Sequence, residues 1–207
     1  MPVFYQPWYL DIVCDKGQWE AVMVEENNGT IAYWPYYLKK KGGLTYLTVP
    51  PLCPHLGPIV ELGDELIKKA SRLSAVGKQL QHLDDMLPTA VLSTINVDPR
   101  MDYLLPLYNK NHSLHTRYTY QLNLLESTEE IWSGITDKQR NIIRKGEKMY
   151  TIHPCHDSDT CIPLLEKVYY RQGIKVPYDV SIFHKLFKSV KEHDAGWCLM
   201  AVDDEFF

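Results

Sequence analysis

Two β-prone runs on either side of an Asn-Gly pair constrain the fold of this chain most strongly. The first run is Ala21-Val22-Met23-Val24, and the second extends from Thr30 to Leu38. Asn28-Gly29 between them is typical of a tight hairpin turn, because both residues tolerate a positive φ. We therefore predict an antiparallel hairpin, to which Leu44 to Val49 adds a third strand.

Helix-like and strand-like segments alternate along the middle of the chain. Glu61 to Leu83 carries apolar residues at near-helical spacing, which predicts an amphipathic helix that covers the sheet. Thr89 to Val97 and Tyr118 to Leu124 are predicted strands, the second because of its alternation. Ser127 to Glu130 has the spacing of a capping box, which predicts one long helix to about Met149. The predicted fold class is α/β (α+β), with a mixed sheet flanked by helices.

The last part of the chain follows the order strand, helix, loop, helix and strand. The expected segments are Tyr150 to His153, Asp159 to Arg171, Gln172 to Tyr178, Val180 to Glu192 and Gly196 to Val202. Asp203 to Glu205 then resembles a hairpin turn before another strand at Phe206-Phe207. Because a strand of two residues cannot pair stably, we expect the natural domain to continue beyond this point.

Charge and cysteine content narrow the functional class. The formal net charge of -4 and the pI near 6.1 create no global field for nucleic acid or an anionic membrane, so an anion site must be local. The five cysteines are odd in number and irregularly spaced, and the opening residues Met1 to Phe4 lack the basic segment and apolar core typical of a signal peptide. Reduced thiols and a cytoplasmic location are therefore expected. No stretch approaches the roughly 20 apolar residues of a membrane span.

Positive side chains gather between Lys138 and Lys148. Arg140, Arg144 and Lys148 recur every four residues and so share one face of the predicted helix, with Lys145 beside them. Arginine can hold a phosphate or a carboxylate through two parallel hydrogen bonds. The alternative is a solvated charged face without a ligand, and the spacing does not decide between the two.

A second basic turn is predicted at the end of the helix that closes at Arg171. Gly173 is expected to stop this helix and Pro177 to prevent its resumption, which places Arg171 and Lys175 at one turn. These residues either contact a ligand or serve packing and capping. The proline-rich loop from Pro50 to Pro58 is the best loop candidate for a site, because it is a rigid connection.

The segment from His153 to Cys161 holds residue types that ligate zinc. They are His153, Cys155, His156, Asp157, Asp159 and Cys161. Their spacing matches neither paired cysteines nor a helical histidine pair, so no metal site is predicted. A Cys155 nucleophile with His153 or His156 as base lacks an oxyanion motif. Dinucleotide, P-loop and serine-hydrolase motifs are absent from the sequence, and no catalytic residue is assigned.

Several short segments together carry a family resemblance. They are Phe4 to Asp11 with Trp19, Trp34 to Tyr36 with Lys39 to Lys41, Pro51 to Pro58, Arg117 to Tyr120, Arg140 to Lys145 and Arg171 to Ile174. Their order and spacing are similar to proteins of the GNAT superfamily related to the Fem family of peptidoglycan aminoacyltransferases. The resemblance spans essentially the whole chain, although each motif is short and specifies superfamily better than substrate.

The resemblance implies two GNAT-like subdomains facing each other across a cleft. Residues 1–148 would form the first, and residues 149–207 would begin the second and leave it incomplete. In Fem-type enzymes an amino acid moves from aminoacyl-tRNA to an amine of a cell-wall precursor, without a metal, and the precursor's phosphates bind basic residues. The residues that map to substrate binding are Arg140, Arg144, Lys145, Arg171 and Lys175.

Two departures from the family pattern concern the substrate. Val176 precedes Pro177 where the family has an arginine, and Asp11 or Lys16 lies where the family has a basic residue near its amino terminus. The expected function is the N-terminal portion of an acyl- or aminoacyltransferase acting on an amine of a small molecule or cell-wall precursor. No cofactor is expected on this portion, and acyl-CoA or aminoacyl-tRNA would be the donor of the full-length protein.

The alternative is a non-catalytic binding module for a phosphorylated or nucleotide-bearing ligand. It would use Arg140, Arg144 and Lys145 without the catalytic half that a transferase needs. Contact with tRNA through the basic helix is a third, weaker hypothesis, because the acidic total opposes it.

Overall fold

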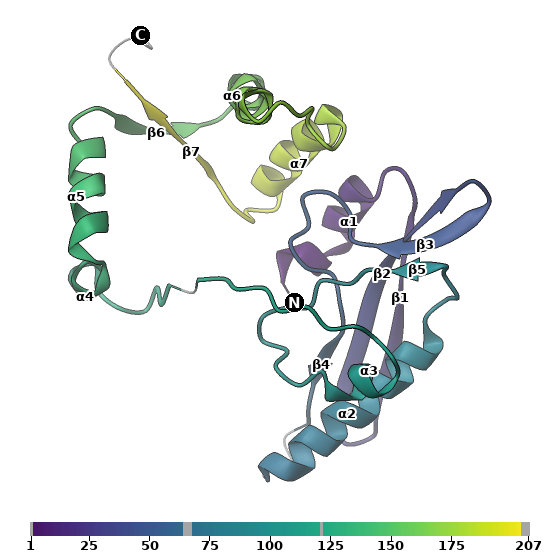
Figure 1. Cartoon of the computed structure of the whole chain (residues 1–207). Helices are drawn as coiled ribbons and strands as arrows, with labels where there is room; N and C mark the ends of the chain where they lie inside the picture. Colours follow the sequence, from purple (N-terminus) through teal and green to yellow (C-terminus); the bar gives the residue numbers. More distant parts are fainter. Residues whose placement is uncertain (1, 64–67, 121, 204–207) are drawn as a thin grey trace. The chain divides into compact units, whose positions relative to one another are not determined.

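The computed structural model describes residues 2–63, 68–120 and 122–203 (Figure 1). The chain divides into two compact units, of which the first comprises Met1–Thr116 with Pro177–Ser189 and the second Arg117–Val176 with Val190–Phe207. The subdomain boundary expected near residue 148 falls inside the second unit and stays a prediction.

The first unit is built on a mixed sheet. Its elements are η1 (Val3–Tyr5), α1 (Pro7–Val13), β1 (Gln18–Glu25), β2 (Ile31–Lys41), β3 (Leu44–Thr48), β4 (Ile59–Glu61), α2 (Lys69–Met86), β5 (Leu92–Ser93), α3 (Leu105–Asn109) and most of α7 (Val180–Glu192). β2 pairs antiparallel with β1, β3 and β4, whereas β5 pairs parallel with β3. The prediction of a mixed sheet flanked by helices is confirmed.

The hairpin at the start of this sheet forms where it was predicted. Gly29 adopts a φ of 80°, and the side-chain oxygen of Asn28 accepts a hydrogen bond from the Thr30 amide at 2.9 Å. The pairing runs from Gln18 opposite Leu38 to Glu25 opposite Ile31. The turn thereby sets the register that decides which side chains of β2 point to each face.

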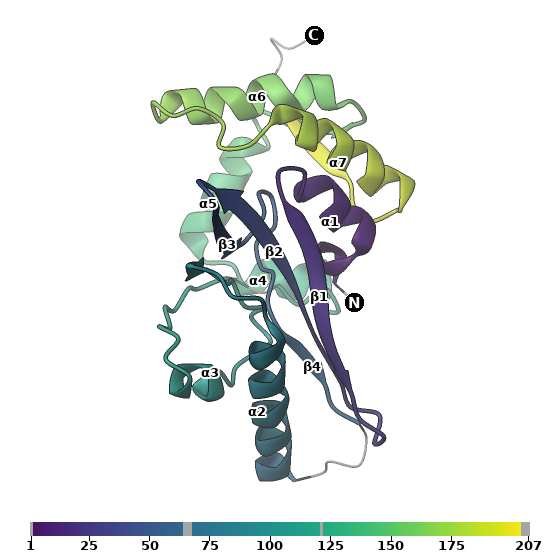
Figure 2. The ribbon, with the colours of Figure 1, turned by 90° about the vertical axis from the view of Figure 1, so that its right-hand side faces the viewer.

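β2 buries side chains on both faces of the sheet. Ala32, Trp34 and Tyr36 belong to one apolar cluster, which includes Leu80 and Leu83 of α2. Tyr33 and Tyr37 alternate with them and belong to, or pack against, a second cluster. That cluster also includes Leu10 and Val13 of α1, and Ile182 of α7. Helices therefore cover both faces, with α1 and α2 on opposite sides of the sheet (Figure 2).

Two predicted element bounds in the first unit are wrong. The helix expected from Glu61 begins at Lys69, because Glu61 pairs with Ile31 as the last residue of β4. The strand expected over residues 89–97 contracts to Leu92–Ser93, and only an isolated bridge from Asn96 to Leu56 follows it. Residues 64–67, which the helix was expected to include, lie outside the described residues.

The second unit contains a two-stranded sheet and three helices. Its elements are α4 (Thr128–Gly134), α5 (Asp137–Gly146), β6 (Thr151–Cys155), α6 (Ser158–Arg171) and β7 (Cys198–Val202). β6 and β7 pair antiparallel, with Thr151 opposite Val202. Together with α7, these elements confirm the predicted order of strand, helix, loop, helix and strand. The strand expected at Phe206-Phe207 lies outside the described residues.

Two further expectations in the second unit are wrong. Residues 118–120 and 122–124 form no strand, and Tyr118 and Tyr120 are fully exposed although their alternation resembled that of a half-buried strand. The single long helix is broken between α4 and α5. Ile135 is extended, and the Thr136 hydroxyl accepts a hydrogen bond from the Gln139 amide, so that Thr136 starts a new helix. The predicted capping box at Ser127 and Glu130 is confirmed.

None of the helices in the described part of the chain has the length and apolar character needed to cross a bilayer.

Truncation of the core under α2 should destabilise the first unit. Leu80→Ala removes a side chain that is completely buried against the sheet, so the free energy of unfolding of the first unit should fall by about 2–5 kcal/mol. Met86→Ala, at the exposed end of the same helix, should change it by about 0.5 kcal/mol or less. Urea unfolding followed by circular dichroism measures both, and equal losses would contradict the packing described.

Candidate functional site

Arg140 is held by the helix that precedes its own. One nitrogen of its guanidinium donates to the Trp132 carbonyl at 3.3 Å and to the Ser133 carbonyl at 3.4 Å, at the end of α4. The other terminal nitrogen pairs with the Asp137 carboxylate, and this contact holds the pKa of Asp137 below its usual range. Arg140 therefore joins α4 to α5, and most of its hydrogen-bonding capacity is used within the protein.

Arg144 lies one helical turn further along α5 and is exposed. The carbon at the centre of its guanidinium lies 5.6 Å from the centre of the Trp132 ring, a cation–π arrangement. One nitrogen also approaches the Asn141 side-chain oxygen at 3.5 Å. Trp132 thus contacts both arginines: its carbonyl oxygen accepts from Arg140, and its ring faces Arg144. The four-residue spacing predicted that the two arginines share one face of the helix.

The remaining cations of the predicted site differ from Arg140 because their charges have no ion-pair partner among the described residues. Arg144, Lys145, Arg171 and Lys175 form no ion pair with any residue that the structure describes. All four are exposed. Lys148, which was predicted on the same helical face, lies beyond the end of α5 at Gly146.

The basic turn after α6 has the predicted local structure. Gly173 ends the helix with a φ of 69°, a conformation that favours glycine because it has no Cβ. Arg171 occupies the last turn of α6, and Lys175 follows in the loop. In this place the Arg171 charge also complements the negative end of the helix dipole.

The proline-rich loop is packed into the first unit. Cys53 and Leu56 belong to the apolar cluster around α1, and the Gly57 amide donates to the buried Tyr5 hydroxyl at 3.2 Å. His55 lies against the Tyr5 ring with its Nδ1 3.6 Å from Asp98, and burial lowers the pKa of this imidazole. The loop therefore closes the core around η1 and α1, which is a structural role.

Asp98 fixes the segment that faces this loop. Both of its carboxylate oxygens accept hydrogen bonds from the Arg100 guanidinium at 2.8 Å, and the Arg100 amide donates a third at 2.9 Å. The Arg100 hydrogen bonds lower the pKa of Asp98 to about 2. Arg100 thus keeps the buried carboxylate ionised, and His55 lies beside it with a lowered pKa.

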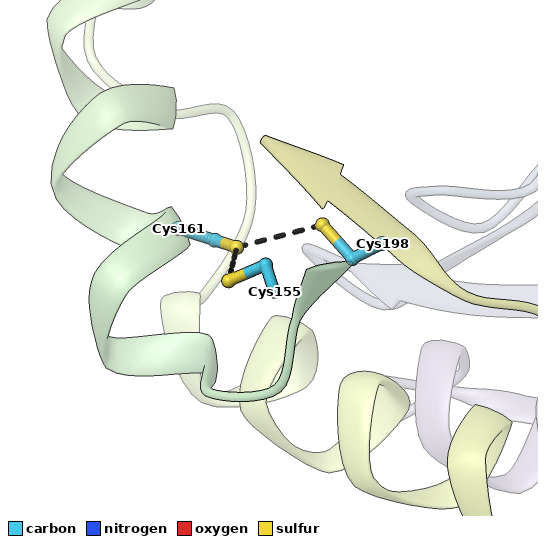
Figure 3. Close-up of side chains that lie close together, drawn as sticks. All are labelled: Cys155, Cys161 and Cys198. Carbon is cyan, nitrogen blue, oxygen red and sulfur yellow. Dashed lines mark hydrogen bonds between the residues drawn. The ribbon is translucent and has the colours of Figure 1, made fainter. Parts of the chain in front are cut away.

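Three thiols converge in the second unit (Figure 3). Cys155 ends β6, Cys198 begins β7 directly opposite it, and Cys161 lies in the first turn of α6. The sulfur of Cys161 lies 3.1 Å from that of Cys155 and 3.5 Å from that of Cys198. All three sulfurs lie within 4.8 Å of one another, and all five cysteines of the chain are free thiols.

This cluster overlaps only in part with the residues that sequence reasoning considered for zinc. Cys155 and Cys161 converge, whereas the Nε2 atom of His153 lies 2.9 Å from the Thr151 hydroxyl oxygen. Cys198 was missed. Both strands of this sheet were predicted, although the first was expected to end at His153, and an antiparallel register that placed Thr151 opposite Val202 would have brought Cys198 to Cys155.

Comparisons with protein-family models, with curated proteins and with solved structures find no match to this chain.

The Asp98 network should make stability depend on pH in acid. Because the pKa of Asp98 is lower in the folded chain than in the unfolded chain, its contribution is complete above about pH 4 and is lost as pH falls to about 2. The contribution at neutral pH should be about 1–2 kcal/mol, since Arg100 is largely exposed and solvent screens the pair.

Asp98→Asn should therefore be destabilised at pH 7 and should lose less further stability between pH 4 and pH 2 than the unaltered chain. Asp102→Asn, at an exposed aspartate nearby, serves as the matched control and should leave the profile unchanged. Unfolding in urea at a series of pH values measures this. Parallel profiles for Asp98→Asn and the unaltered chain would contradict the network.

Proposed function

We propose that this chain is the N-terminal portion of an acyl- or aminoacyltransferase of GNAT/Fem type, which transfers an acyl group to an amine acceptor. The observation that supports it best is Arg144. This guanidinium is placed over the Trp132 ring and forms no ion pair with a described residue. An arginine that is held in place by a ring and has no ion-pair partner can bind a phosphate or carboxylate of the acceptor.

Anion binding matters for such a reaction because acyl transfer depends on position. An acceptor amine must be held close to the acyl carbonyl and must lose a proton as the bond forms. Contacts to a remote phosphate supply binding energy that holds the amine in place. In this proposal Arg144 and Lys145 make those contacts, and Arg140 positions Arg144 by locking α5 to α4.

Arg171 and Lys175 complete the proposed set at the second basic turn. They are the weaker members, because Arg171 has an alternative role at the negative end of the α6 dipole. Their exposure and lack of ion pairs with described residues leave them free to meet a polyanionic ligand.

The proposed reaction takes place in the cytoplasm, where five free thiols persist. The donor of the full-length protein would be acyl-CoA or aminoacyl-tRNA, and the acceptor an amine on a small molecule or a cell-wall precursor. With a net charge of -4, any contact with tRNA would have to be local to the α5 cations.

A non-catalytic binding module is the second candidate function. The exposure of Arg144 favours it, because acyl transfer benefits from exclusion of water whereas reversible ligand binding does not require it. This module would bind a phosphorylated or nucleotide-bearing ligand through the same side chains. An assay for acylated amine with the extended protein, given acyl-CoA and aminoacyl-tRNA in turn, separates the two functions.

Removal of the Arg144 side chain should weaken anion binding. Because hydrogen bonds to charged groups contribute about 1.5–3 kcal/mol, Arg144→Ala should lower the affinity for a nucleotide sugar by about tenfold to a hundredfold. The loss should shrink at high salt, where the electrostatic contribution is screened. Isothermal calorimetry at two salt concentrations measures both effects.

Lys138→Ala provides the matched control. It removes one positive charge from the same helix, and Lys138 forms no ion pair with a described residue. Its affinity should stay within about twofold of the unaltered chain, since a rim charge contributes little. Equal losses in the two variants would show a diffuse charge effect, and an unchanged affinity in Arg144→Ala would remove the proposed site.

A further inference from the structure

The three thiols lie close enough together to share one metal ion. A zinc–sulfur bond is about 2.3 Å long, so two sulfurs on a tetrahedral zinc lie about 3.8 Å apart. The Cys161 sulfur lies 3.1 Å from the Cys155 sulfur and 3.5 Å from the Cys198 sulfur, both somewhat closer than this value, and all three sulfurs lie within 4.8 Å of one another. One ion among Cys155, Cys161 and Cys198 would reach every sulfur with only small side-chain adjustments.

The three ligands are positioned by backbone elements. Cys155 and Cys198 are register partners in the β6–β7 ladder, which fixes the two side chains opposite each other. Cys161 is presented by α6, whose start is set by the Asp157 side chain accepting a hydrogen bond from the Asp159 amide at 3.1 Å. Figure 3 shows the three sulfurs pointing toward one another from these elements.

A bound metal ion would change the protonation of this cluster. Neighbouring sulfurs oppose ionisation because two thiolates in contact repel each other. A bound divalent ion reverses this balance, since a coordinating thiol loses its proton.

The packing of the second unit gives such an ion a structural role. Among the described residues of this unit, the only buried hydrophobic ones are Cys155, Ile162 and Val202. A core of this size contributes little stability, and small units commonly depend on a metal or a cross-link. An ion held by the three cysteines would tie β6, α6 and β7 together.

We propose that Cys155, Cys161 and Cys198 bind one zinc ion and leave its fourth position open. Thiolate sulfur selects zinc over magnesium or calcium. No fourth His, Cys, Asp or Glu side chain joins the group within the described residues, and Cys161 and Cys198 are partly exposed, so water or an external ligand can reach that position. This site is independent of the proposed transferase function.

Binding changes the protonation of the ligands. Each thiol gives its proton to solvent as its sulfur binds, so three protons leave and the zinc–trithiolate site carries a formal charge of -1. No electron is transferred. The affinity should therefore fall as pH decreases, because protons compete with the metal for sulfur.

Cobalt titration tests the assignment directly. The full 207-residue chain, reduced, stripped of metal and kept without oxygen, should bind one Co²⁺ and develop a thiolate-to-cobalt charge-transfer band that Zn²⁺ abolishes. Cys161→Ser and Cys198→Ser should each weaken binding at least tenfold, since even outer-shell changes cost about 10–100-fold. Cys14→Ala, which removes a buried thiol of the first unit, should bind as the unaltered chain does.

Alkylation of each cysteine in the unaltered chain, with and without zinc, tests the proposal even if a variant misfolds. Zinc should protect Cys155, Cys161 and Cys198 and leave the reactivity of Cys14 and Cys53 unchanged. Absence of the cobalt band, or full affinity in both serine variants, would overturn the proposal. The proposal would also be overturned if the reduced chain bound no cobalt and formed a Cys155–Cys161 disulfide in air.

Discussion

The first unit depends on one strand that is buried on both faces. Trp34 and Tyr37 of β2 are each completely buried, and they point to opposite sides of the sheet. The register that separates them is set at the Asn28-Gly29 turn, because a shift by one residue would exchange the two faces. Both helical layers therefore take their positions from β2, and the proline-rich loop and α7 close the α1 side.

The second unit is organised by polar contacts instead of a large core. Arg140 joins α4 to α5 through two carbonyls and Asp137, and Trp132 positions Arg144. The thiols of β6, α6 and β7 form its other organised group. Both groups that could bind a ligand thus lie in this unit, where packing alone supplies little stability.

Sequence reasoning succeeded where local chemistry determines structure. The hairpin, the capping box at Ser127 and the helix stop at Gly173 each depend on residues within a few positions of one another. The predictions were wrong where the tertiary structure overrode a local preference. Alternation at Tyr118 to Leu124 indicated a strand, but residues 118–120 and 122–124 pair with no strand in the described part of the chain.

The candidate site shows the same limit. The helical spacing of Arg140 and Arg144 could be seen in the sequence. Their shared contact with Trp132 depends on the helix break at Ile135, which the helix propensities of these residues did not predict. Cys198 lies far along the chain from Cys155, and only the strand register brings them together. Contacts between distant segments carry no local signal, so the thiol cluster can be recognised only once the register of the two strands is known.

Native-state hydrogen exchange tests this division of stability most directly, because each amide reports its own opening free energy. We expect the β2 amides to exchange slowest and the β6 and β7 amides to exchange much faster, and we expect Zn²⁺ to slow exchange only in β6, α6 and β7. Amides of β6 and β7 that are as protected as those of β2 without metal, and unaffected by Zn²⁺, would contradict this division.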